Sequence, residues 1–438
     1  MKREGDTMIK VGLLGYGTVG GGVYNILKTK KEDIERKLGE EIQIKKILVK
    51  EKDKMRKYGV DASLLTVDYK EIVEDPEIQI VVELIGGETP TLDYIKEAIN
   101  RHKNVVTANK LILAKYGREI FQLAKNNNAK VYYEGSVGGG IPIIKTLKES
   151  MIANKIERIY GILNGTTNYI LTQMTEKSIN FEEALKEAQS LGYAESDPYF
   201  DVSGLDSTYK ISILSSLAFG SFIDVNSIYV EGIDRIERED IEIAEELGYT
   251  IKLLAIGKRY EDKILDIRVH PTFISKNSPL SKINGVYNVV QIHGDAVGDI
   301  MIYGQGAGEM PTASAVVADI MEAAKSIKYH IENEYSIGRL NGLKLIEIDE
   351  IENSFYIRLR VNDKPGVFAK IAKAFGDNEV SIASVIQKQR LNPVVPIFLQ
   401  THPIKEKNLK RAIASLKEID DVIEIKNIIR VEDFDEKF

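Results

Sequence analysis

The decisive stretch of sequence is Ile9-Lys10-Val11-Gly12-Leu13-Leu14-Gly15-Tyr16-Gly17-Thr18-Val19-Gly20. Its apolar start is typical of a buried β-strand, and its end has the pattern G-x-G-x-x-G at the start of a predicted helix. In this context the glycines let the backbone approach a pyrophosphate, and the helix N-terminus supplies N–H groups and a favourable dipole. The stretch therefore predicts a dinucleotide site that includes Gly15, Gly17 and Gly20; a flexible glycine turn is the alternative.

Further short apolar runs follow, separated by amphipathic stretches that are predicted to be helices. The runs lie at residues 42–49, 78–85, 104–107 and 130–134. Fully buried parallel strands consist of continuous runs of Val, Ile and Leu, and alternation of such strands with helices is typical of βαβ units. We therefore predict a Rossmann domain over residues 1–135, in a chain of the α/β class.

Composition limits the chemistry of the chain. With 438 residues it is too long for one ordinary core, and we expect three domains. A net charge of −7 without a dense Lys/Arg block argues against nucleic acid and anionic membranes as partners. The sequence has no cysteine, which excludes disulfides and thiolate chemistry. Any redox reaction therefore needs a bound cofactor.

The first residues lack the pattern of a signal peptide, and no apolar run approaches the ~18 residues of a membrane span. We therefore expect a cytoplasmic protein. Met1 and Met8 are both candidate start residues, and the sequence leaves the choice between them open.

Helices and strands are more segregated after residue 135. We predict a helix near 142–152, a strand near 156–163, several helices up to about 254, strands near 264–269 and 286–293, and a closing helix at 311–327. This order is typical of an α+β domain, here residues 136–330, that holds the substrate. A polar, charged stretch at 331–352 is predicted to be a linker.

The last part of the chain, residues 353–438, has a compact pattern of its own. Strands are predicted at 355–361, 380–387, 394–401 and 422–431, and helices at 366–375 and 406–416. The order β-α-β-β-α-β is that of the ferredoxin-like motif. We therefore predict a third, ferredoxin-like domain.

Carboxylates and a lysine are concentrated between residues 191 and 210. Asp206 and Lys210 share one face of a helix predicted to begin near Ser203 or Gly204, and Glu195 lies in the loop before it. Hydride exchange at a carbonyl carbon needs a group that gives and takes a proton at the oxygen. We predict this role for Lys210, with Glu195 and Asp206 holding a substrate ammonium or hydroxyl; a surface ion pair beside an acidic loop is the alternative.

Four other positions are candidates for ligand contacts. Lys110 follows the fourth predicted strand, at the sheet edge where open α/β folds bind ligands; a surface lysine at a helix start is the alternative. Lys50, beside Glu51 at the end of the second strand, favours NADP over NAD; an ordinary solvated charge at each of the two positions is the alternative. The hydroxyl of Thr166 can hold a ligand or cap a helix. Glu134 precedes a glycine-rich turn whose carbonyls suit a hard cation; a metal-free hinge is the alternative.

Seven motifs occur in a distinctive order: G-Y-G-T-V-G, T-A-N-K, E-G-S-V-G-G-G-I-P, G-I-L-N-G-T-T-N-Y, G-Y-A-E-S-D-P, G-L-D-S-T-Y-K and G-Q-G-A-G. In order and spacing they resemble the homoserine dehydrogenase family, in its three-domain form with a C-terminal ACT domain, over nearly the whole chain. The resemblance implies reversible oxidation of L-homoserine to L-aspartate 4-semialdehyde with NADP or NAD, in threonine, methionine and isoleucine biosynthesis.

The resemblance also implies roles for single residues. The catalytic lysines are Lys110 and Lys210, and the residues on homoserine are Glu195, Asp206 and Thr166. Cofactor contacts are implied for Thr18, Val19, Gly192 and Gly308, and Lys50 stands where many members carry Arg, which leaves the cofactor preference open. A monovalent cation, usually sodium in this family, maps to Glu134 and to backbone oxygens of Val137, Gly139 and Ile141.

The turn at residues 362–368 resembles the part of an ACT domain that senses an amino acid, usually threonine in this family, whose members form dimers or tetramers. Two alternatives stay open. One is another ACT-bearing dehydrogenase that acts on a hydroxy acid, although the histidine and acid pair usual in such enzymes is not found here. The other is a dinucleotide-binding regulatory protein that senses amino acids, which the set of Glu195, Asp206 and Lys210 disfavours.

Overall fold

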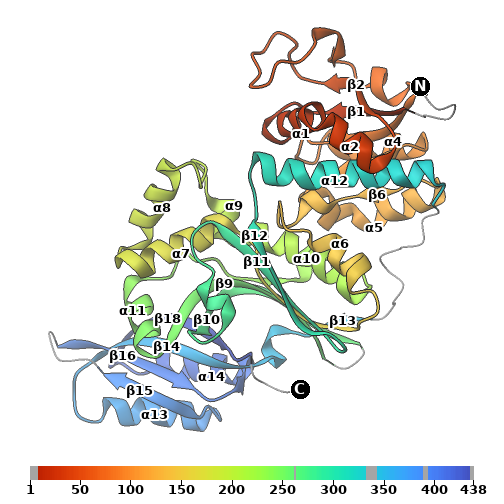
Figure 1. Cartoon of the computed structure of the whole chain (residues 1–438). Coiled ribbons are helices and arrows are strands. Elements are labelled where there is room, and N and C mark those ends of the chain that lie inside the picture. The colour runs from red at the N-terminus through yellow and green to blue at the C-terminus, as the bar shows by residue number, and fades with distance from the viewer. Residues whose placement is uncertain (1–7, 261–262, 332–342, 388–392, 435–438) are drawn as a thin grey trace. The chain divides into compact units, whose positions relative to one another are not determined.

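The structure is a computed structural model that describes residues 8–260, 263–331, 343–387 and 393–434 (Figure 1). It divides into two units. The first contains residues 1–159, 209–227 and 288–342, and the second contains residues 160–208, 228–287 and 343–438. Half of the predicted linker at 331–352, namely residues 332–342, lies outside the described residues. In the part of the chain that is described, no helix is long and apolar enough to cross a membrane.

A parallel sheet forms the core of the first unit. Its strands lie in the order β3-β2-β1-β4-β5-β6. Their bounds are β1 (Ile9–Leu14), β2 (Ile42–Leu48), β3 (Leu65–Thr66), β4 (Ile78–Glu83), β5 (Asn104–Thr107) and β6 (Val131–Tyr132). This is the Rossmann order, in which the direction of winding reverses between β1 and β4 and leaves a crevice at their carboxyl ends. The predicted Rossmann topology is confirmed.

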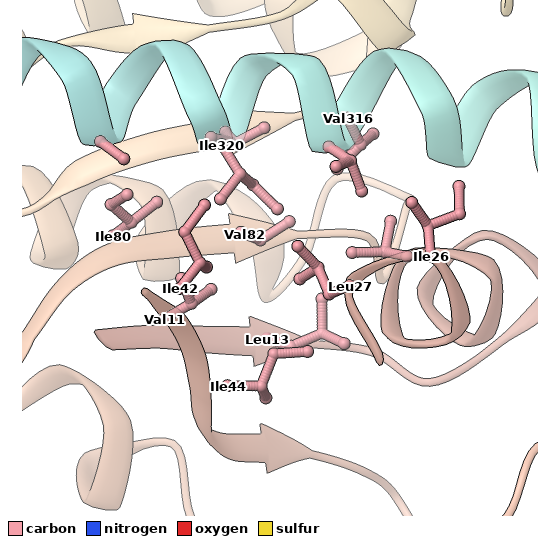
Figure 2. Packing of buried hydrophobic residues seen from close by; sticks show 14 of the residues in the cluster. Val11, Leu13, Ile26, Leu27, Ile42, Ile44, Ile80, Val82, Val316 and Ile320 are labelled. Atoms are coloured by element: carbon pink, nitrogen blue, oxygen red, sulfur yellow. The ribbon is translucent and has the colours of Figure 1, made fainter. Parts of the chain in front are cut away.

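Helices cover this sheet, and one of them comes from far along the chain. The helices are α1 (Thr18–Thr29), α2 (Lys31–Leu38), α3 (Lys70–Val73), α4 (Thr91–Asn100), α5 (Lys110–Asn126) and α12 (Glu309–Lys328). Figure 2 shows Val316 and Ile320 of α12 above Val82 of β4 and beside Leu27 of α1. These side chains are almost fully buried, and burial of each stabilises the fold by roughly 1.5–3 kcal/mol.

The close approach of α1 and α12 explains one of the extra glycines after the phosphate loop, Gly22. A Cβ atom at Gly22 lies only 2.9 Å from the Cβ of Ala313 and 3.1 Å from the carbonyl oxygen of Glu309. A side chain at this position therefore pushes α12 away from α1. The first unit also contains α6 (Ile143–Lys145), β12 (Gly298–Gln305) and most of β11 (Tyr287–Gly294).

The second unit contains a mixed sheet with neighbouring strands in the order β9-β10-β18-β14-β16-β15. The bounds are β9 (Tyr249–Tyr260), β10 (Ile264–Ser275), β14 (Glu352–Asn362), β15 (Ile382–Gln387), β16 (Val394–Thr401) and β18 (Val422–Glu432). The prediction of helices up to about residue 254 is wrong at its end, because the chain is already a strand from Tyr249. The apolar run that follows Tyr249 belongs to the long β9–β10 antiparallel pair.

The helices of this unit are α7 (Gly165–Lys177), α8 (Phe181–Ser190), α9 (Tyr199–Val202), α11 (Arg238–Glu246), α13 (Val367–Asp377) and α14 (Glu406–Lys417). Strands β14, β15, β16 and β18 with helices α13 and α14 have the predicted β-α-β-β-α-β order, which confirms the ferredoxin-like part. Its last strand also pairs in parallel with β10, where Thr272 lies opposite Arg430 and Ile274 opposite Glu432. The ferredoxin-like sheet therefore continues the sheet of the residues before it.

Candidate active site

The glycine loop between β1 and α1 has the geometry of a phosphate cradle. Gly15 has φ of +97°, and a Cβ at Gly20 lies 2.2 Å from the carbonyl oxygen of Gly15, so neither position accepts a side chain. A Cβ at Gly17 meets no atom within 4 Å, so its surroundings are open. Gly17 is also the N-cap of α1 and provides no side-chain cap to the N–H groups of the first turn, where Thr18 and Val19 lie. These N–H groups suit an anion.

The carboxyl ends of β4 and β5 are joined by a buried acid that the sequence analysis missed. Glu83 is fully buried and accepts hydrogen bonds from the backbone N–H of Ile85 at 2.8 Å and from the hydroxyl of Thr107 at 2.6 Å. Burial raises the pKa of the Glu83 carboxyl. Asn109 caps α5, and Lys110 is the first, half-buried residue of that helix. Lys110 therefore begins α5 at the sheet edge where it was predicted.

Three further predicted cofactor positions have separate surroundings. Lys50 is exposed just beyond β2. Gly308 has φ of +123° and is the N-cap of α12 in the first unit, and Gly192 has φ of +75° in the turn after α8 in the second unit. Both glycines therefore lie in backbone conformations that other residues rarely adopt. At Gly192 a Cβ meets no atom within 4 Å, so the turn has room for a neighbouring group.

The turn after β6 contains the residues predicted to hold a cation. The two carboxylate oxygens of Glu134 accept the backbone N–H groups of Ile144 and Lys145, both at 2.8 Å. Val137 and Ile141 are buried, and a Cβ at Gly139 lies 2.7 Å from the backbone of residue 306, so the turn is tightly packed. Burial raises the pKa of Glu134, and a cation offsets that penalty.

The chemistry of this donor set fits a hard monovalent cation, which prefers oxygen ligands. An ionised carboxylate has about four acceptor positions, of which the two N–H groups use two. Among the described residues there is no group of three or more His, Cys, Asp or Glu side chains that suits a metal ion. A cation at this turn therefore depends on backbone oxygens beside Glu134.

The N-terminus of α7 connects two of the predicted substrate residues to their neighbours. Asp206 is 2% exposed and accepts a hydrogen bond at 2.8 Å from Nδ2 of Asn164. Asn164 also caps α7 through its Oδ1 and donates at 2.8 Å to Asp201. Thr166, in the first turn of α7, donates at 2.6 Å to the carbonyl oxygen of Tyr193. The start of α7 thus fixes both Asp206 and the loop that precedes Glu195.

Glu195 and Lys210 differ in exposure. Glu195 is exposed in the loop after α8, where its carbonyl oxygen accepts a hydrogen bond from Gln189. Lys210 is 7% exposed and lies one turn after Asp206 in α10 (Leu205–Phe219), a helix that begins in the second unit and continues into the first. The predicted helix start near Ser203 or Gly204 is therefore close to the observed one. An exposed surface ion pair does not describe Asp206 and Lys210, because both side chains are buried.

Sequence reasoning missed Glu83, Asn109 and Asn164. The signal for Glu83 was an acid at the end of an almost wholly apolar strand, since a charge in that position is rarely buried without partners. The signal for Asn164 was an asparagine directly before a helix, where Asn is a preferred cap. Its bonds to Asp201 and Asp206 depend on the fold and had no local signal.

Three family models match the chain. The model described as homoserine dehydrogenase matches residues 142–321, the homoserine dehydrogenase NAD binding domain matches residues 15–134, and the ACT domain matches residues 355–421. The ferredoxin-like part is therefore an ACT domain.

Relatives and solved structures agree with these models. The homoserine dehydrogenase of Neisseria gonorrhoeae is 42% identical over 430 residues, which are 97% of this chain and 98% of that protein. The crystal structure of a homoserine dehydrogenase from Thiobacillus denitrificans has a TM-score of 0.91 and 43% identity, and the match covers 98% of this chain and 99% of that one.

A shorter solved relative is a hyperthermophilic archaeal homoserine dehydrogenase mutant in complex with NADPH, with a TM-score of 0.60 and 27% identity. The match covers 72% of this chain and 98% of that one. The family models, the full-length relatives and the Rossmann geometry lead to one conclusion. This chain is an oxidoreductase that belongs to the homoserine dehydrogenase family.

Proposed function

We propose that Lys210 exchanges the proton, and that Asp206, Glu195 and Thr166 bind the substrate, when this enzyme interconverts L-homoserine and L-aspartate 4-semialdehyde with NAD(P). The observation that carries the proposal is the helix α10, in which Asp206 and Lys210 are both buried and lie one turn apart. Burial of an acid and an amine at such a short separation suits recognition of an amino-acid substrate with a reacting oxygen nearby.

The carboxylate of Asp206 holds the substrate ammonium group. Asn164 donates to one Asp206 oxygen at 2.8 Å, which fixes the direction of the other carboxylate lone pairs before the substrate arrives. Glu195 adds a second negative charge from the loop after α8, and the link between Thr166 and Tyr193 holds that loop near the start of α7. Such fixed contacts reduce the entropy lost on binding.

Lys210 acts on the oxygen of the reacting carbon. In the reductive direction its ammonium group gives a proton to the carbonyl oxygen as that oxygen becomes an alcohol, and in the oxidative direction its neutral amine takes the proton back. The bound nicotinamide supplies the hydride in reduction and accepts it in oxidation. Lys110, at the start of α5, is a second cation at the mouth of the crevice and adds positive potential toward the forming alkoxide.

The cofactor lies on the glycine loop, with its pyrophosphate at Gly15, Gly17, Thr18, Val19 and Gly20. Gly192 and Gly308 provide further close backbone approaches, and Lys50 lies near the ribose. Both NADP and NAD remain candidates. Support for NADP comes from the archaeal relative that was solved with NADPH. A monovalent cation, sodium by resemblance, is held by Glu134 with backbone oxygens of Val137, Gly139 and Ile141.

We assign the domains as residues 1–135 for the cofactor, 136–330 for the substrate and 353–438 for the ACT domain, joined by 331–352. The ACT domain binds an amino-acid effector, and the chain assembles as a homodimer or homotetramer. The reaction serves threonine, methionine and isoleucine biosynthesis in the cytoplasm. Support for the effector is the ACT match, since such domains sense small ligands.

Oxidation of NADPH and of NADH by the purified enzyme with aspartate 4-semialdehyde tests the reaction. We expect turnover with that substrate, and Lys210→Ala should lower kcat by about 10²–10⁴, the usual contribution of a general acid. Lys282→Ala is the matched control, because Lys282 is an exposed lysine far along the sequence from the proposed site. No turnover with aspartate 4-semialdehyde contradicts the proposed reaction, and a Lys210→Ala rate within a few fold of the wild type removes Lys210 from the proton transfer.

A further inference from the structure

A buried lysine in β9 lies outside the residues assigned so far. Lys252 of β9 is 2% exposed. Its Nζ donates to the Oδ1 atom of Asn168 at 3.0 Å, to the carbonyl oxygen of Ile283 at 2.6 Å and to the Oδ1 atom of Asn284 at 3.0 Å. An ammonium group has three hydrogens, so these bonds use all of them, and all three acceptors are uncharged. Burial of a cation among neutral oxygens costs free energy, and an apolar side chain of similar size fills such a space without that cost. The presence of a lysine therefore favours a role beyond packing.

Asn168 connects this lysine to the start of α7. Its backbone N–H donates to the carbonyl oxygen of Asn164 at 3.2 Å, and its Nδ2 donates to the carbonyl oxygen of Tyr287 at 3.1 Å. Asn164 in turn caps α7 and donates to Asp206. Lys252 therefore lies two hydrogen-bonded residues away from the buried carboxylate, although it touches neither that carboxylate nor Thr166 in the structure.

We propose that Lys252 is a positioning residue for the substrate: its ammonium group fixes the first turn of α7, and thereby fixes the direction in which Asn164 presents Asp206. The inference rests on the proposed role of Asp206 in binding the homoserine ammonium group. The protonated amine holds Asn168 together with the segment that contains Ile283 and Asn284. A neutral amine has only two hydrogens, so it releases one of the three acceptors and loosens this turn.

The surroundings of Lys252 make its protonation state sensitive to pH. Burial lowers the pKa of Lys252 to about 7, and the charge of Glu176 on α7 opposes this shift. Lys252 borders a cavity of about 260 Å³ that is also lined by Glu176, Lys276 and Lys282. Lys276 is paired at 3.4 Å with Glu245 of α11, and Lys282 is exposed, so the other cations at this cavity are paired or face the solvent.

The sign of the effect follows from the number of hydrogens. Below a pH of about 7 the amine is protonated and makes all three bonds, and above it the amine is neutral and makes two. Homoserine binding by the wild type should therefore benefit from Lys252 most at low pH. A variant without the amine lacks this benefit at every pH.

The experiment compares Lys252→Met with the wild type in homoserine oxidation from pH 6 to pH 9. We expect the variant to raise the KM for homoserine by about tenfold or more at pH 6, the effect expected when a charged hydrogen bond is lost. The ratio of the two KM values should fall as the pH rises above 7. The KM for NAD(P) should stay within twofold, because the glycine loop lies in the other unit.

Two controls separate positioning from general damage. Lys282→Met removes a lysine that lines the same cavity and should leave both KM values unchanged. Asn168→Ala removes the acceptor and leaves the amine, so it should reproduce the higher homoserine KM, and the double variant should be no worse than Lys252→Met alone. Asn168→Ala also serves as the test if Lys252→Met fails to fold.

The outcomes are distinct from those of the proposed function. A wild type that does not turn over homoserine contradicts the proposed function. A wild type that does, with a Lys252→Met variant whose homoserine KM stays within threefold at every pH, overturns the inference alone. An equal rise in the KM values for homoserine and NAD(P) also overturns it, because that result indicates a general loss of structure.

Discussion

The attachment of the ACT domain to the preceding residues rests on a buried ion pair that can be removed. Arg358 of β14 is 1% exposed, and its Nε lies 2.9 Å from Oδ1 of Asp240, which is fully buried in α11. The guanidinium also lies 2.8 Å from a carboxylate oxygen of Glu237 and 2.5 Å from one of Glu239, which are about half exposed. The change Arg358→Met keeps an apolar chain of similar length and leaves Asp240 without its cation.

We expect this change to destabilise the protein by about 3 kcal/mol. Removal of one partner of a buried pair costs about 3–5 kcal/mol, since the remaining charge is left uncompensated. The lower end applies because Asp240 still accepts hydrogen bonds from the hydroxyl of Tyr356 and from Nδ2 of Asn427, both at 2.9 Å. For a folding unit of about 200 residues this corresponds to a Tm lower by about 6–12 °C.

The pH dependence has a definite sign. Burial already raises the pKa of Asp240, and loss of the guanidinium raises it further. A group with a raised pKa in the folded state stabilises the fold while it is protonated and loses that contribution as the pH rises. The Tm deficit of Arg358→Met should therefore be smaller at pH 5 than at pH 8.

Thermal unfolding followed by circular dichroism measures both effects. Arg360→Met is the matched control, because Arg360 is an exposed arginine on the same strand whose guanidinium lies 4.0 Å from Glu424, and its loss should cost less than ~0.5 kcal/mol. Adding Asp240→Asn to Arg358→Met should restore much of the lost Tm, because it removes the buried charge. If Arg358→Met and Arg360→Met melt within 2 °C of each other, the ion pair does not hold the ACT domain in place.

Two more predictions concern the cofactor loop and a buried histidine. Gly17→Ala should raise the KM for NAD(P)H at least tenfold and leave the Tm nearly unchanged, because its Cβ meets no protein atom within 4 Å but occupies the space a pyrophosphate needs. Gly20→Ala should raise this KM and also lower the Tm, since its Cβ lies 2.2 Å from the carbonyl oxygen of Gly15. A wild-type KM in Gly17→Ala excludes the loop as the phosphate site. His270 is fully buried, and burial together with the charges of Arg430 and Arg268 holds its pKa well below 6.5, so below pH 6.5 the unfolded chain binds a proton that the folded chain does not. The free energy of unfolding of the wild type, measured in urea, should therefore fall by about 2 kcal/mol between pH 6.5 and pH 5. In His270→Gln this free energy should depend less on pH, and equal pH profiles for the two proteins contradict the assignment.

Local sequence patterns were sufficient to predict most of the helices and strands. The strand at 394–401 was predicted at its observed bounds, and the helix at 406–416 ends one residue early. These elements have clear periodicity and are bounded by turns, so short-range sequence was sufficient. The stretch from Tyr249 was misread because β9 is buried on both faces over much of its length. Without alternation, an apolar run of this kind does not distinguish a strand from a buried helix.

The sequence was sufficient to predict which residues belong to the candidate site, but not which of them form hydrogen bonds with one another. Gly15, Gly17 and Gly20 lie within six residues, and their spacing directly after a predicted strand and at the start of a predicted helix was sufficient to propose them as a cofactor site. Asp206 is held by Asn164, which is 42 residues earlier in the chain. That bond exists because β7 (Ile156–Ile162) leads into α7 at the point where α10 begins, and no local pattern encodes this meeting.

The buried charges between β10 and β18 show how far local sequence can predict contacts between strands. Arg268 lies in β10 and Glu432 ends β18, and each side chain is at most 4% exposed, so each needs a buried partner of opposite charge. Glu432 contacts Lys258 at 2.5 Å, Tyr160 at 3.0 Å and Arg268 at 3.4 Å, so four residues from distant parts of the second unit form one network. A shift of β18 by one residue along β10 turns Glu432 to the opposite face and leaves two cations buried without it. The network thus selects a single register for β18. Because β18 also belongs to the ACT sheet, the same carboxylate determines how the ACT domain is joined to β10.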